Sequence, residues 1–115
     1  MRTYDGGCHC KKVRYRVTTD LASVLECNCS HCAIKGLLLN FVPAEAFTLL
    51  SGENELTDYQ FNKKMIRHLF CKTCGVESFA TGEKDGMPMR AVNVRCLDEI
   101  DLTTLTRTPF NGKAW

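Results

Sequence analysis

The chain has 115 residues, 44% of them hydrophobic and 24% charged, a composition that fits a folded protein and argues against disorder. This length predicts a single domain over residues 1–115, whose core is thin enough to gain from a structural metal. The net charge of +2 comes from scattered basic residues, so no nucleic-acid partner is expected. No apolar run approaches the roughly 18 residues of a membrane span, so no membrane partner is expected either.

Short segments in which apolar and polar residues alternate, separated by turn residues, predict an all-β protein. In chain order, extended segments are expected at residues 13–18, 23–26, 37–42, 47–50, 56–61, 65–70, 78–81 and 89–96. Residues 43–46 are expected to form one helical turn, and no segment keeps a helical period. The chain also lacks any linker, internal repeat or low-complexity tract.

The unusual feature of the composition is its eight cysteines, seven of which fall into three tight groups. The groups are Cys8 and Cys10, then Cys27, Cys29 and Cys32, then Cys71 and Cys74. Residues 1–7 lack the apolar centre of a secretory signal, so a reducing cytoplasm is the expected compartment. Closely spaced cysteines in that compartment indicate zinc binding more than disulfides.

Two of the groups combine naturally into a closed zinc site. Cys71 and Cys74 form a Cys-x-x-Cys turn followed by Gly75, which is typical of a zinc knuckle. Cys8 and Cys10 supply the two further thiolates that a tetrahedral site needs. This pairing predicts a structural zinc that ties the start of the chain to a late segment.

The remaining group, Cys27, Cys29 and Cys32, is one ligand short of a closed shell. Catalytic zinc sites commonly keep three protein ligands and one open position, so we favour an open site. A closed site remains the alternative, and four residues are candidates for the fourth ligand: His9, His31, His68 and Cys96. His31 directly precedes Cys32, and neighbouring residues rarely point at one ion. Cys96 lies on an expected strand and fits a buried thiol.

Several motifs follow one another in a fixed order along the chain. They are Gly6-Gly7-Cys8-His9-Cys10 with Val13-Arg14-Tyr15, then Cys27-Asn28-Cys29-Ser30-His31-Cys32 with Lys35-Gly36 and Phe41-Val42-Pro43, then Tyr59-Gln60-Phe61-Asn62, His68 and Phe70-Cys71-Lys72-Thr73-Cys74-Gly75, and finally Asn93-Val94-Arg95-Cys96-Leu97-Asp98 and Phe110-Asn111-Gly112-Lys113-Ala114-Trp115. In these motifs the chain resembles the glutathione-dependent formaldehyde-activating enzymes, the family that also contains centromere protein V.

The resemblance implies an Mss4-like all-β fold of several short coiled sheets. It also implies two zinc ions, one structural on Cys8, Cys10, Cys71 and Cys74 and one on Cys27, Cys29 and Cys32 whose free position accepts a thiol. The implied activity is that of a carbon–sulfur lyase acting on the adduct of glutathione and formaldehyde. Two departures from the family pattern are Lys11, where many members have glycine, and Ala33-Ile34, where basic residues often follow the third cysteine.

Such chemistry needs a group that moves a proton to or from the hydroxymethyl oxygen. His31 and His68 are the nearby titratable residues that we name for this role, so we expect the proton to pass through one of them. The expected partner is a small-molecule thiol such as glutathione, and a homo-oligomer is left open. Two other functions compete: a zinc-stabilised protein-interaction module without catalysis, and a thiol redox or zinc-handling protein.

Overall fold

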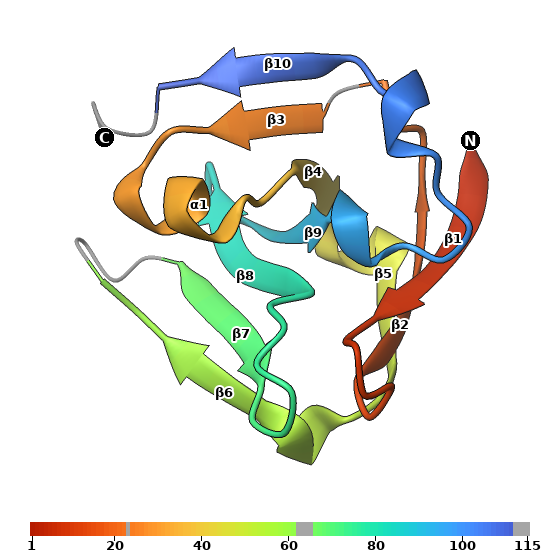
Figure 1. The fold of residues 1–115 in the computed structure, drawn as a ribbon, viewed down its shortest axis with the longest axis vertical. Coiled ribbons are helices and arrows are strands. Elements are labelled where there is room, and N and C mark those ends of the chain that lie inside the picture. The colour runs from red at the N-terminus through yellow and green to blue at the C-terminus, as the bar shows by residue number, and fades with distance from the viewer. Residues whose placement is uncertain (23, 62–65, 112–115) are drawn as a thin grey trace.

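The computed structural model describes residues 1–22, 24–61 and 66–111, which form two β-sheets and one short α-helix (Figure 1). The smaller sheet has the strand order β1 (Arg2–Gly7), β2 (Arg14–Thr19), β5 (Phe47–Ser51). The larger sheet has the order β10 (Arg107–Phe110), β3 (Val24–Cys27), β4 (Leu39–Pro43), β9 (Met87–Asn93), β8 (Phe79–Lys84), β7 (Arg67–Cys71), β6 (Leu56–Tyr59). Neighbouring strands are antiparallel except β10 and β3, which are parallel.

Short helical elements connect the strands. The α-helix is α1 (Ser30–Lys35), and the single turns of 3-10 helix are η1 (Ala44–Ala46), η2 (Glu53–Glu55), η3 (Val94–Cys96) and η4 (Leu102–Thr104). The larger sheet curves around α1, with β10 and β3 on one side of the helix and β7 and β6 on the other (Figure 1). This curvature brings residues from β3, α1 and β7 to one face of the sheet.

Strand β2 shows how the alternating sequence produces the core. Tyr15 and Val17 are fully buried, whereas Arg16 between them is exposed and pairs with Asp5 of β1 at 2.8 Å. The Tyr15 ring stacks on Phe47 with ring centres 4.9 Å apart. Because successive side chains of a strand point to opposite faces, the apolar half of this pattern packs inward and the charged half faces water.

The same core reaches the cysteines of the predicted closed site. Cys8 and Cys71 are buried in one cluster with Val13, Tyr15 and Val94. Gly6 of β1 also forms an isolated bridge to Leu97, which joins the smaller sheet to the end of the chain that follows β9. The first strand is therefore held against late segments by apolar packing as well as by the cysteines.

The structure confirms the all-β prediction, with differences at the element ends. Strands β1 and β10 and helix α1 were not predicted. The segment expected at 89–96 leaves the strand after Asn93 and forms η3 instead, and the helical turn expected at 43–46 is η1. Ser23 and Met65, the first residues of two expected segments, lie outside the described residues. Within the described part of the chain, no helix has the length and apolar character needed to cross a membrane.

Candidate metal centres and their surroundings

Two cysteines from the start of the chain and two from its second half meet at one point. Cys8 and Cys10 follow β1, while Cys71 ends β7 and Cys74 lies in the turn after it. Their sulfur atoms all lie within 4.8 Å of one another, and Cys10 Sγ is 3.6 Å from both Cys8 Sγ and Cys71 Sγ. A tetrahedral zinc about 2.3 Å from each sulfur separates the sulfurs by about 3.8 Å. The four-cysteine cluster therefore has the donor set and spacing of a closed zinc site.

Two tight turns shape this four-cysteine cluster. In the first turn the Val13 amide donates to Cys8 Sγ at 3.3 Å, and Lys11 adopts a left-handed φ of 67°. In the second turn the Gly75 amide donates to the Cys71 carbonyl at 2.7 Å, with Gly75 at a φ of 80°. A left-handed backbone suits glycine and costs other residues energy. This geometry explains why glycine fits the position that Lys11 occupies here.

The second cluster, Cys27, Cys29 and Cys32, is built by the start of α1. Cys27 ends β3, and Cys29 is the N-cap of the helix, where its sulfur accepts the Cys32 amide at 3.3 Å. The Cys29 amide in turn donates to Cys27 Sγ at 3.5 Å. The three sulfur atoms lie within 4.8 Å of one another, with Cys32 buried and the other two half-buried. One helix terminus thus gathers three sulfurs near the surface.

Small residues of the central strands lie beneath this three-cysteine cluster. Ala80 of β8 and Ala91 of β9 are cross-strand partners, and both are buried with Cys32 in one apolar cluster. His68 of β7 pairs with Ala80 in the same row. Because directly opposed residues of a sheet project from the same face, His68 lies on the face that α1 covers.

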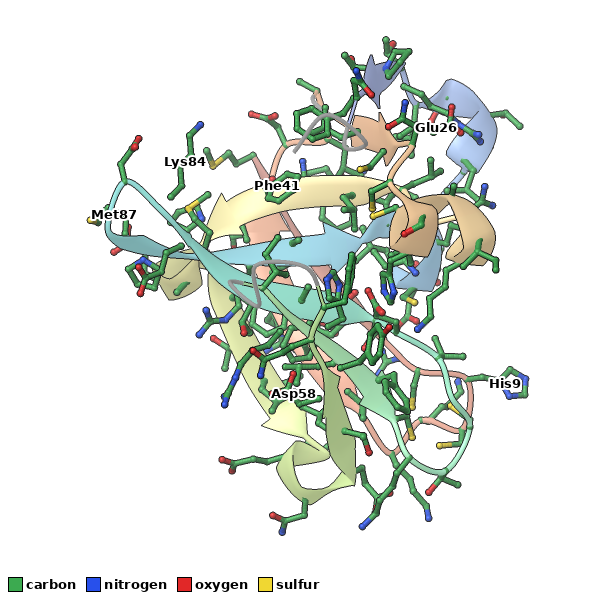
Figure 2. The ribbon with its side chains drawn as sticks, turned by 90° about the vertical axis from the view of Figure 1, so that its left-hand side faces the viewer. His9, Glu26, Phe41, Asp58, Lys84 and Met87 are labelled. Carbon is green, nitrogen blue, oxygen red and sulfur yellow. The ribbon has the colours of Figure 1, made fainter. Side chains whose placement is uncertain are left out.

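Among residues 1–22, 24–61 and 66–111, no fourth Cys, His, Asp or Glu joins the three-cysteine cluster. His9 is exposed and points away from the molecule (Figure 2). His31 and His68 turn toward Glu77 instead, and Cys96 Sγ lies 3.9 Å from the Glu77 carbonyl. Burial raises the pKa of the Cys96 thiol to about 12. The four residues considered as closing ligands are therefore placed elsewhere.

Glu77 is the residue that the sequence analysis missed. Its carboxylate accepts hydrogen bonds from His31 Nε2 at 2.8 Å and Lys35 Nζ at 3.0 Å, both on Oε1, and His68 Nδ1 lies 3.6 Å from Oε2. Burial alone would raise the pKa of Glu77, but its interactions with His68, Lys35 and His31 lower that pKa to about 2. Its only sign in the sequence is that an acidic residue stands among the uncharged residues that lead into β8.

The two histidines also pack against aromatic rings. The centres of the His31 and His68 rings are 4.2 Å apart, and Phe61 stacks on His68 at 5.1 Å. Tyr59, at the end of β6, stacks on His31 at 5.6 Å. Burial lowers the pKa of His31 and outweighs the opposite effect of Glu77. Both candidate proton-transfer residues therefore sit in one packed group beside α1.

The described residues line two surface depressions. One, of about 710 Å³, is lined by Lys12 and residues 49–55, and the other, of about 580 Å³, by residues of β2, β4 and η1. Neither is lined by a cysteine.

Comparison with known proteins agrees with this arrangement. Residues 3–110 match the protein family described as glutathione-dependent formaldehyde-activating enzyme. A crystal structure of a Rhodobacter sphaeroides protein is similar, with a TM-score of 0.81, 28% sequence identity, and coverage of 91% of this chain and 97% of that one. Since the family match spans nearly the whole chain, this protein belongs to the glutathione-dependent formaldehyde-activating enzyme family.

Proposed function

We propose that this protein is a zinc-dependent carbon–sulfur lyase that forms or cleaves the hydroxymethyl adduct of a small thiol such as glutathione with formaldehyde. The observation that carries the proposal is the three-cysteine cluster, which has no fourth protein ligand among the described residues. The family description supplies the two reactants. The proposal places the protein in a reducing compartment such as the cytoplasm, where its cysteines stay available as thiolates for zinc.

The two clusters would have different roles. The four-cysteine cluster, with Cys8 and Cys71 buried, would hold a structural zinc whose binding stabilises the fold. The three-cysteine cluster would hold a second zinc, which supplies a position that lowers the pKa of an incoming thiol and orients its sulfur. Three thiolates leave the site with a net negative charge, so capture of the thiol matters more than activation of a carbonyl.

The chemical step needs a base and an acid close to the sulfur. In the forming direction the thiolate lone pair attacks the formaldehyde carbon, a C–S bond forms, and the C=O π electrons move to oxygen. That oxygen then takes a proton, which His31 or His68 would deliver. Cleavage is the reverse, in which the hydroxyl proton leaves and the C–S electrons return to sulfur.

Isotope-exchange NMR with ¹³C-formaldehyde and glutathione tests this proposal, because it separates catalysed exchange from the spontaneous reaction. Wild-type protein should accelerate exchange, and Cys27→Ser, Cys29→Ser and Cys32→Ser should each remove the acceleration. Cys96→Ala is the matched control and should retain it, since Cys96 lies outside both clusters. Zinc-loaded wild-type protein without acceleration would contradict the glutathione–formaldehyde proposal.

A zinc-stabilised interaction module is the second candidate. It is favoured by exposed apolar side chains such as Ile34 of α1, which is 86% exposed. This function predicts full zinc loading and no exchange with any small thiol.

A further inference from the structure

Glu77 is a buried carboxylate whose side chain is 2% exposed. An ionised carboxylate is costly to bury unless cations and hydrogen-bond donors compensate it. Lys35 provides the cation and His31 a second donor to the same oxygen, Oε1. An ionised carboxylate only accepts hydrogen bonds, so His31 carries a hydrogen on Nε2 in this contact.

These two partners lie one turn apart on the same helix. His31 and Lys35 are at positions i and i+4 of α1, so their side chains share one face. A helix of six residues is too short to be stable by itself. The Cys29 cap holds its start, Gly36 with a φ of 68° ends it, and Glu77 binds along this face. Arg95 Nε also donates to the Gly36 carbonyl at 2.8 Å, and Cys32 packs on Ala80 and Ala91, but Glu77 is the distant residue that binds two side chains of the helix.

The backbone at Glu77 is itself fixed by the Cys71–Gly75 turn and by β9. The Cys71 amide donates to the Val76 carbonyl at 3.1 Å, which closes the knuckle directly before Glu77. The Glu77 carbonyl then accepts from Asn93 Nδ2 at 3.0 Å. The carboxylate therefore joins the helix that carries Cys29 and Cys32 to the turn that carries Cys71 and Cys74.

We propose that Glu77 is a positioning residue, which holds α1 against the Cys71–Gly75 turn and thereby sets the arrangement of the three-cysteine cluster. The inference rests on the proposed zinc at that cluster for its metal-binding consequence. Its consequence for the helix is independent of any metal. In this role the Glu77 carboxylate does not itself bind either zinc ion. It acts through α1.

A metal ion on His31, His68 and Glu77 is the competing explanation, since their donor atoms lie within 4.8 Å and His68 Nδ1 has no hydrogen-bond partner among the described residues. Lys35 Nζ, however, lies 3.0 Å from Oε1, one of the two carboxylate oxygens that such an ion could use. The positive charge of Lys35 beside the carboxylate would repel a second cation. The hydrogen-bonded anchor accounts for more of the contacts.

Zinc competition with a chromophoric chelator, compared between wild type and Glu77→Gln, measures the first consequence. The zinc ion of the three-cysteine cluster should bind roughly 10–100-fold more weakly in the variant, which is the usual effect of removing a residue that orients the ligands of a metal. The other zinc should be unchanged. Glu83→Gln, the same change on an exposed residue of β8, is the control and should alter neither. Unchanged zinc affinities in Glu77→Gln would overturn the proposal.

Hydrogen exchange at α1 measures the second consequence without using zinc. The Ala33 amide donates to the Cys29 carbonyl and the Leu37 amide to the Cys32 carbonyl. Both should exchange at least about tenfold faster in Glu77→Gln, because the helix opens locally. If wild type binds a single zinc, the proposed function fails, yet this exchange result still decides the role of Glu77.

Two further outcomes are decisive. If Glu77→Gln does not fold, Lys35→Met replaces it, and faster exchange confined to α1 with weaker binding of one zinc supports the proposal. If exchange at α1 in Lys35→Met is as slow as in wild type, or is faster by the same factor throughout the protein, the proposal is overturned. A third metal equivalent in wild type that disappears in Glu77→Gln would also overturn it, in favour of the metal ion on His31, His68 and Glu77.

Discussion

Replacing single cysteines by serine should separate the two clusters by their effects on folding. Cys71 is fully buried at the end of β7, and its sulfur lies beside that of Cys10, which is 61 residues earlier in the chain. Cys29 is half-buried and caps a six-residue helix. We expect Cys71→Ser to prevent folding and Cys29→Ser to remove one zinc while both sheets persist.

The magnitudes follow from what each sulfur does. A structural zinc contributes about 10–16 kcal/mol of apparent binding energy in small domains, comparable with or larger than a total stability of about 5–15 kcal/mol. Loss of one zinc ligand therefore removes most of the free energy that keeps the protein folded. Serine at Cys29, by contrast, keeps an oxygen that can accept the Cys32 amide, so the helix cap changes by about 1 kcal/mol or less.

Zinc content by mass spectrometry, circular dichroism and thermal unfolding measure these effects together. Cys29→Ser should show one zinc fewer, an unchanged β-sheet spectrum and a cooperative transition, whereas Cys71→Ser should show no transition or should precipitate. Cys96→Ala serves as the control and should keep both zinc ions. Equal collapse of Cys29→Ser and Cys71→Ser, or a full zinc content in Cys29→Ser, would refute the assigned division between the clusters.

Three other perturbations test the local geometry. Lys11→Gly should stabilise the protein by about 0.5–1 kcal/mol in urea unfolding, because Lys11 has a φ of 67°; a loss of stability would contradict this reading of the turn. Gly52→Ala should destabilise it by at least about 1–3 kcal/mol in the same assay, since its φ is 90° and a Cβ would lie 2.4 Å from the Lys12 carbonyl oxygen; a neutral result would count against that contact. A chelator should remove one zinc quickly from the half-buried Cys27 and Cys29, and the second only as the β-sheet signal is lost, so simultaneous release would argue against separate roles.

The fold class was predictable because its strands follow simple alternation. Val13, directly before β2, and Tyr15 and Val17 within it are apolar and buried at every second position, which the sequence pattern shows directly. Strand β10 has no such pattern, since all four of its residues are exposed and it is held by pairing with β3. Helix α1 is too short for a helical period, and a cysteine rather than serine or aspartate caps it.

The cysteine groups were predictable for a different reason: their spacing is local, and the structure brings Cys8, Cys10, Cys71 and Cys74 together as expected. Glu77 could not be foreseen, because its partners on α1 are more than 40 residues away in sequence and no pattern links them or His68 to it. Contacts that depend on the curvature of the larger sheet are not visible in a linear pattern.

The four-cysteine cluster combines two cysteines from the start of the chain with two from a much later segment, and this has a consequence for biosynthesis. During translation, Cys8 and Cys10 emerge from the ribosome well before Cys71 and Cys74, so the nascent chain carries two unprotected thiols for that interval. Closing so long a loop also slows folding relative to local contacts. The young polypeptide is therefore most vulnerable to oxidation and to capture of the wrong ion before Cys71 and Cys74 have emerged.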